Sequence, residues 1–165
     1  MADLKVTIKE ELTLNGDSHW AKNTLTISDV DEVFRRIVTC PANNETTIAR
    51  FRSSVGNVSG TATYDSALDV QDVKYIRVTN LDGSNSLTLS LQIEVGEDDT
   101  GADTSTSLLV EPGKSFMLGS PHDGIGAVAS GSYNANLVTD LVDVDSLVVQ
   151  PGDNAINVEV YIASA

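Results

Sequence analysis

The stretch VKYIRVTNLDGSNSLTLSLQIEV, residues 73–95, contains the clearest structural signal in the chain. In its second half, Leu, Ile or Val occupies every other position from Leu87 to Val95, with polar residues between them. This period of two is typical of a β-strand with one buried and one exposed face. The first half is rich in β-branched and aromatic residues, and Asp82–Gly83 between the halves is typical of a tight turn. The stretch therefore predicts an antiparallel hairpin on which the remaining strands pack.

Similar apolar runs, separated by turn residues, fill much of the remaining chain. Strand, turn and strand again are predicted over residues 33–51, 107–118 and 137–162, with Pro41, Pro112 and Pro151 in the turns. A short helix over residues 29–36 is the alternative for the first of these segments, since its apolar residues also lie at helical spacing. The predicted fold class is an all-β, antiparallel β-sandwich or jelly-roll-like domain of about eight to ten short strands.

The N-terminal segment shows a weaker alternation. Leu4, Val6 and Ile8 alternate with polar residues, and an alternation resumes after two consecutive glutamates, Glu10 and Glu11. This predicts a strand with a β-bulge at the glutamates. A turn is predicted at residues 15–17, and a short strand follows around residues 25–27.

Length and charge restrict the class of protein. With 165 residues, of which 41% are apolar, the chain is expected to form a single all-β domain over residues 1–165. Ten Lys and Arg against 24 Asp and Glu give a formal charge of −14, which disfavours binding to nucleic acid or to an acidic membrane. An acidic surface of this kind also keeps an abundant protein soluble before it assembles.

The chain holds one cysteine, Cys40, so no intrachain disulfide is possible and a buried thiol is expected. The first residues lack an apolar signal region, and no segment reaches the roughly 20 apolar residues that span a bilayer. Synthesis and folding in a cytoplasm are therefore expected.

The sequence contains no motif that predicts an enzyme or a cofactor site. There is no P-loop, dinucleotide-binding fingerprint or zinc-ligand spacing. Two acidic groups are the only metal candidates, since Ca²⁺ prefers oxygen ligands: Asp98, Asp99 and Asp103 in one, and Asp143 with Asp145 in the other. Solvated loop and strand carboxylates are the alternative for both groups.

Five segments, taken in order, resemble a known class of protein. They are residues 32–39 leading to 45–47, then 73–82, 109–116, 142–147 and the ending VEVYIA at 158–163. In this order and spacing they resemble small virion structural proteins of tailed bacteriophages, particularly marine ones, from about residue 29 onward. The likeness implies a decoration or cement protein on the outer surface of the phage head, made in the bacterial host cytoplasm.

The resemblance further implies the partners. A head decoration protein binds the major capsid protein, and a homotrimer is expected. Residues 1–28 match least well, so they are either a peripheral strand or an arm that contacts a neighbour. If they form an arm, the interface candidates are Leu4, Val6 and Ile8, followed by the loops at residues 53–66 and 119–136.

Two alternatives remain. A tail, neck or fibre component is also structural and would share this fold class. A carbohydrate-binding module would use the single Trp, Trp20, as a platform on which a sugar ring stacks.

Overall fold

The structure is a computed structural model, and it describes residues 2–52, 68–93, 104–119, 126–127 and 142–165. These residues form an all-β sandwich, as predicted, and a single short 3₁₀ helix at Val70–Asp72. Within the described ranges there is no helix long and apolar enough to cross a membrane.

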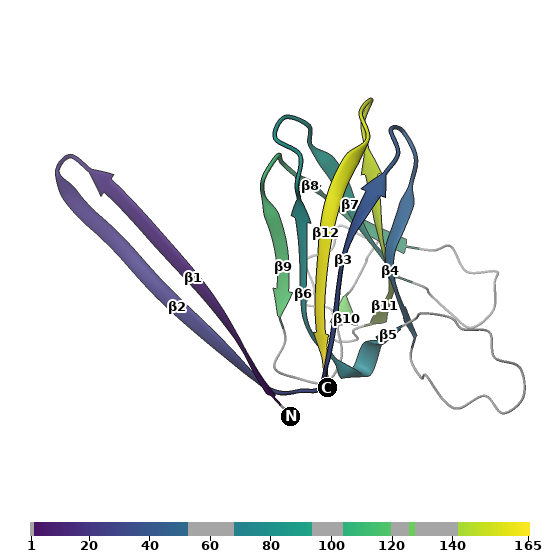
Figure 1. Cartoon of the computed structure of the whole chain (residues 1–165), viewed down its shortest axis with the longest axis horizontal. Helices are drawn as coiled ribbons and strands as arrows, with labels where there is room; N and C mark the ends of the chain where they lie inside the picture. Colours follow the sequence, from purple (N-terminus) through teal and green to yellow (C-terminus); the bar gives the residue numbers. More distant parts are fainter. Residues whose placement is uncertain (1, 53–67, 94–103, 120–125, 128–141) are drawn as a thin grey trace, which may run out of the picture.

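Two sheets stack face to face, and a separate hairpin projects from them (Figure 1). The four-stranded sheet has the order β3 (Glu32–Cys40), β12 (Ile156–Ser164), β6 (Val73–Asn80) and β9 (Ser115–Gly119). The other sheet has the order β5 (Leu68–Asp69), β4 (Thr46–Arg52), β11 (Val142–Pro151), β7 (Leu87–Ile93) and β8 (Thr104–Val110), and β10 (Gly126–Ala127) also pairs with β11. All pairs are antiparallel except the parallel pair of β4 and β5.

Strands that follow one another closely in the chain lie in opposite sheets. β6 pairs with β12 and β9, whereas β7 pairs with β11 and β8, so the predicted hairpin over residues 73–95 is wrong. The same holds for β3 and β4, β8 and β9, and β11 and β12, where hairpins were also predicted. An alternating pattern identifies the buried face of a strand, but it is the same whether the next strand lies beside it or across the core.

Asn80 shows how the chain passes from one sheet to the other. It ends β6, is fully buried, and donates from Nδ2 to the carbonyl oxygens of Asn85 (2.8 Å) and Val110 (3.2 Å). Its Oδ1 accepts from the backbone N–H of Asp82 at 3.0 Å, and the Asp82 carboxylate in turn accepts from the N–H groups of Ser84 and Asn85, both at 2.7 Å. These bonds satisfy the polar groups of a corner that closes one end of the core.

The core lies between the two sheets. Its side chains come from one face of each strand, including Val78, Val160 and Ile162 on one sheet and Leu89 and Leu147 on the other, all at most 1% exposed. Cys40 belongs to the same cluster, as expected for a buried thiol. β12 is an inner strand of its sheet. Ile156, Val158 and Ile162 alternate with outward-facing residues because only one face of β12 covers the core.

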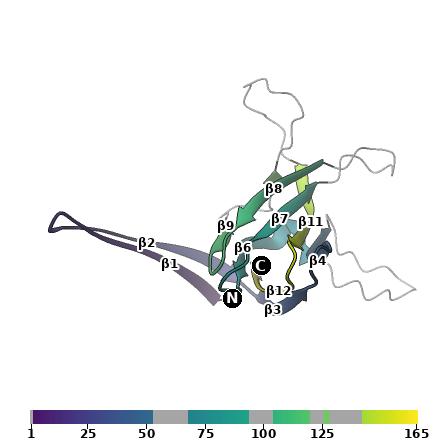
Figure 2. The ribbon, with the colours of Figure 1, turned by 90° about the horizontal axis from the view of Figure 1, so that it is seen from above.

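The hairpin of β1 (Ala2–Leu14) and β2 (Asp17–Val30) projects from the sandwich as an arm, seen from two directions in Figures 1 and 2. Its turn residues, Asn15 and Gly16, both have positive φ (53° and 89°), as two-residue hairpin turns require. Residues 29–36 lie in strands β2 and β3 and the link between them, so the helical alternative is wrong.

The predicted bulge at Glu10 and Glu11 is also wrong. The pairing is unbroken from Leu4 opposite Ile27 to Leu14 opposite Asp17, and the register shifts only between Ala2 and Leu4. Ile8 and Leu12 are an even number of residues apart, so they lie on the same face without any change of register. Glu10 simply occupies a position in the apolar face.

Candidate interaction surface on the arm and the sandwich edge

The arm has one apolar face. Because residues directly opposite each other in an antiparallel pair point to the same side, the pairing places the even-numbered residues of β1 together with the odd-numbered residues of β2. We call their large apolar members the apolar row: Leu4, Val6, Ile8, Leu12, Leu14, Leu25 and Ile27.

The base of the arm is packed on the sandwich. Ile27 and Val30 are buried in a small cluster with Tyr75 and Ala163, and Leu4 and Val6 pack against the same cluster. Lys74 Nζ donates to the carbonyl oxygens of Ser28 and Asp29 at 3.1 and 3.2 Å. The arm is therefore anchored where it leaves the outer face of the four-stranded sheet.

Beyond its base the apolar row is uncovered. Ile8 is 43% exposed, Leu12 58%, Leu14 54% and Leu25 37%. An isolated two-stranded hairpin is marginally stable in water, because it buries little apolar surface. A chain that extends such a hairpin into solvent with an apolar row along one face has a surface suited to a protein partner.

The opposite face of the arm is basic and carries the exposed Trp. Lys9 lies directly opposite Lys22, Glu11 opposite Trp20, and Lys5 lies nearer the base. Lys9 forms an ion pair with Glu11 (2.6 Å), and Trp20 is 70% exposed beside a hollow of about 300 Å³. Exposed Trp residues are typical of the centres of protein interfaces.

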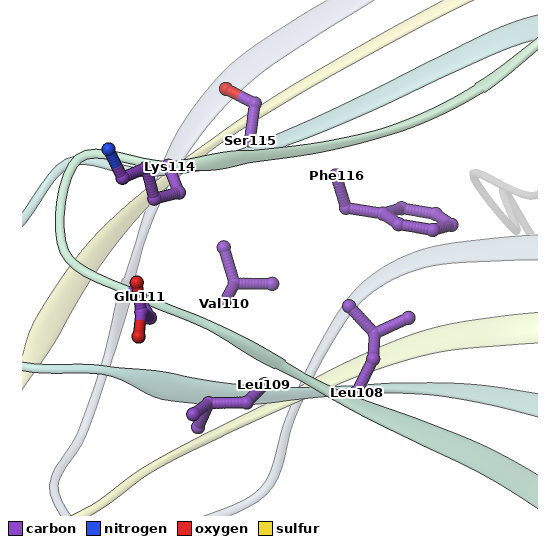
Figure 3. A pocket seen from close by; sticks show the side chains of 7 residues that line it. All are labelled: Leu108, Leu109, Val110, Glu111, Lys114, Ser115 and Phe116. Carbon is purple, nitrogen blue, oxygen red and sulfur yellow. The ribbon is translucent and has the colours of Figure 1, made fainter.

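The sandwich has a cleft at one side. β8 and β9 are the last strands of their sheets on that side, and in the described residues each pairs with one strand only. Figure 3 shows Leu108, Val110 and Phe116 in the space between the two strands, a hollow of about 300 Å³ with Glu111 and Lys114 at its turn end. We call this hollow the edge cleft.

The opposite side of the sandwich is covered by a side chain. Arg36 of β3 donates from Nη2 to the carbonyl oxygen of Ile48 in β4 at 2.7 Å, and its guanidinium lies 4.9 Å from the centre of the Phe34 ring. This bond joins the two sheets at that side. In the edge cleft the apolar side chains of Leu108 and Phe116 lie at the corresponding place, and the charged residues Glu111 and Lys114 lie at its turn end.

An ionic network crosses the outer face of the four-stranded sheet next to the arm. The carboxylate of Glu159 accepts from Arg35 Nε and Nη2 (2.8 and 2.6 Å) and from Arg77 Nη2 (2.7 Å). Arg77 also lies over the ring of Tyr161, which packs edge-on against Tyr75. Each charge in this group has an opposite charge beside it. We therefore interpret the network as one that stabilises the sheet by joining β3, β12 and β6.

The interface candidates from the sequence lie in different environments. Leu4 and Val6 are half-buried at the base of the arm, and Ile8 is the first residue of the uncovered part of the row. Sequence reasoning missed Leu12, Leu14 and Leu25 as members of this surface. The even spacing of Leu4, Ile8 and Leu12 is the signal that would have included Leu12 and Leu14.

The predicted metal candidates are not brought together by the described structure. Asp98, Asp99, Asp103 and the side chain of Asp143 lie outside the described residues, as do residues 53–66 and most of 119–136. Asp145 is exposed on β11. In the part of the chain that the structure describes, no three His, Cys, Asp or Glu residues are grouped as a metal site requires.

No protein-family model matches the chain. No curated protein sequence matches it either.

Proposed function

We propose that this protein is a structural component of a virus particle, most specifically a decoration protein on the outer surface of a phage head, and that it catalyses no reaction. The observation that carries the proposal is the arm, which leaves the sandwich with its apolar row uncovered. A surface of this kind is useful in an assembly, where a neighbouring subunit covers it. The arm is then the joint between this protein and a neighbouring subunit of the assembly.

The strand order supports this proposal. We infer that β3, β12, β6 and β9 facing β4, β11, β7 and β8 form the eight-stranded jelly roll, a sandwich architecture used by viral capsid domains and also by lectins. The fold alone does not imply a function, since unrelated functions share it. Its value here is that the architecture and the resemblance to virion proteins agree.

The charge of the chain supports an outer position in the particle. At −14, the protein would be repelled from packaged nucleic acid. On the outer surface the same charge keeps decorated particles apart and so prevents their aggregation.

The arm has enough apolar surface to serve as a joint. Burying a Leu or Ile side chain completely contributes about 1.5–3 kcal/mol, so covering four that are already about half buried contributes roughly 1 kcal/mol each. Ile8, Leu12, Leu14 and Leu25 would together contribute about 4 kcal/mol. Losing two of them should weaken attachment by roughly 30-fold, since 1.4 kcal/mol is a factor of ten.

The test is attachment to particles. Phage particles grown without this protein are mixed with the purified full-length chain, and the bound copies are counted and located by electron microscopy. We expect the wild type to cover the outer head in numbers comparable to the major capsid protein. The variant Leu12→Ser/Leu14→Ser should bind roughly 30-fold more weakly.

The control is Leu81→Ser, which removes a leucine that is 45% exposed on the sandwich and not on the arm. It should bind as the wild type does. Wild-type protein that binds only the tail, neck or fibres, or that occupies few sites, would contradict the decoration role and support the alternative structural role. Equal binding by the arm variant and the control would contradict the role of the arm.

A second candidate, carbohydrate binding, rests on Trp20. Its exposed ring lies beside a hollow lined by Glu10, Glu11 and His19, and an aromatic ring with nearby carboxylates is typical of sugar sites. A glycan array probed with the wild type and with Trp20→Ala tests it. Absence of a signal with the wild type removes this candidate.

A further inference from the structure

The edge cleft is a part of the sandwich surface where apolar side chains are left partly uncovered. Two strands end their sheets there, and in the described residues neither β8 nor β9 has a partner on its outer side. Unpaired strand edges next to apolar side chains favour association with another strand. Leu108, Val110 and Phe116 form the apolar floor of the hollow, and Leu109 and Met117, 65% and 43% exposed, extend the apolar surface along its rims.

The arm has the complementary properties. It is a narrow, two-stranded element with an apolar row on one side, and among the described residues no third strand pairs with either of its outer edges. Its first strand, 13 residues long, spans about 43 Å at roughly 3.3 Å per residue. The edge strands β8 and β9 have 7 and 5 residues, so the outer half of the arm is long enough to lie along the whole cleft.

The arm is the part of the chain that the acidic sandwich of another copy repels least. Residues 2–30 contain three Lys and five acidic residues, which leaves 10 − 3 = 7 basic and 24 − 5 = 19 acidic residues, a charge of −12, for the remainder. All three Lys of the arm lie on its polar face, with Glu11 as the one acidic residue among them. The arm itself therefore carries a charge of only 3 − 5 = −2, and when its apolar face docks, its three Lys lie on the face turned away from the cleft.

The arm does not reach the cleft of its own chain. Its base is held by Lys74 and by the packing of Ile27 against Tyr75, and Figures 1 and 2 both show its tip well away from β8 and β9. A contact from this position must therefore be made to a different molecule.

We propose that the outer half of the arm, with Ile8, Leu12 and Leu14 facing inward, docks in the edge cleft of a second copy. This inference rests on the proposed function and adds to it the surface that the arm binds, which is the edge cleft of a second copy. Arm and cleft are different surfaces, so the contact is head-to-tail and each copy both gives an arm and receives one. Head-to-tail contacts close into a ring when the rotation allows it, which agrees with the expected homotrimer.

Cross-linking of mixed copies tests the contact. One preparation of the full chain carries Thr13→Cys near the arm tip, and a second carries Ser115→Cys at the start of β9; both positions are exposed. The native Cys40 is fully buried and does not compete. With a short bis-maleimide reagent we expect a cross-linked pair of twice 17.5 kDa in the mixture.

Two controls make the result specific. Thr39→Cys replaces Ser115→Cys with an exposed position on β3, at the other edge of the same sheet, and should give at least a tenfold lower yield. Light scattering should give a multiple of 17.5 kDa for the wild type and the single-chain mass for Leu12→Ser/Leu14→Ser.

A wild type of single-chain mass, or equal yields at Ser115→Cys and Thr39→Cys, overturns the proposal. So does cross-linking within one chain that carries both Thr13→Cys and Ser115→Cys at high dilution, because the arm would then reach its own cleft. If the wild type has the single-chain mass in solution and still covers phage heads, only this inference is overturned and the decoration role stands. A chain whose copies cross-link as expected but bind no particle overturns the decoration role alone.

Discussion

Removing the side chain of Asn80 should destabilise the sandwich more than any other single change to an asparagine in the described residues. Asn80 is fully buried and makes three side-chain hydrogen bonds, to Asn85 and Val110 as donor and from Asp82 as acceptor. At about 1 kcal/mol for each bond, Asn80→Ala loses about 3 kcal/mol, and the carbonyl and amide groups left behind in the buried corner add to this. For a chain of this size the melting temperature should fall by roughly 6–12 °C.

Urea unfolding followed by far-ultraviolet circular dichroism is the suitable assay. Fluorescence is unsuitable, because the only Trp is Trp20, which is exposed on the arm and does not report on the sandwich. The matched control is Asn157→Ala, since Asn157 is exposed and accepts one side-chain bond, from Thr39 at 2.7 Å. It should lose less than about 0.5 kcal/mol. An Asn80→Ala variant within about 0.5 kcal/mol of the wild type would refute the assignment of the corner as a stabilising unit.

Three more predictions concern single ionisable groups. Burial raises the pKa of the Cys40 thiol, so a thiol-specific reagent should leave the folded chain unmodified and label one thiol per chain in urea. The N–H groups of Ser84 and Asn85 lower the pKa of Asp82. Because the folded pKa is the lower one, its contribution to stability is full above the unfolded value of about 3.9 and is lost as the pH falls through the folded value. The stability difference between wild type and Asp82→Asn should therefore shrink between pH 7 and pH 3, as urea unfolding at both pH values would measure. Glu159→Ala leaves two guanidinium groups without their acceptor and should cost about 2 kcal/mol in the same assay, while Arg35→Ala, whose side chain is 65% exposed, should cost less than about 1 kcal/mol.

Much of the fold could be predicted from alternation, but the pairing of the strands could not. Leu87, Leu89, Leu91 and Ile93 are all buried, as the pattern from Leu87 to Val95 predicts for the described part of that strand. The Asp82–Gly83 pair suggested a hairpin, yet the chain crosses there to the other sheet. The decisive residue is Asn80, because a polar residue in the last position of a strand can cap the core instead of pointing into solvent. Its burial depends on Val110, which is distant in sequence.

The interaction surface could be predicted only in part. The alternation of Leu4, Val6 and Ile8 correctly indicates a strand with an apolar face. It does not show that Leu4 and Val6 are partly covered by the chain's own Tyr75 and Tyr161, since this depends on the angle at which the arm leaves the sandwich. The edge cleft depends on which strands end each sheet, and this order is a property of the whole topology.

The short connections that cross between the sheets have a consequence for folding. No two strands joined by a short turn in the sandwich pair with each other, so all the ladders of the four-stranded sheet need segments that are remote along the chain, such as β3 with β12. Folds dominated by distant pairings of this kind form slowly and cooperatively. The arm is the opposite case, since its two strands are adjacent in sequence and can pair residue by residue, starting at their turn. Refolding of this protein should accordingly be biphasic, with a quick local event in the first thirty residues and a slow, all-or-none closure of both layers together.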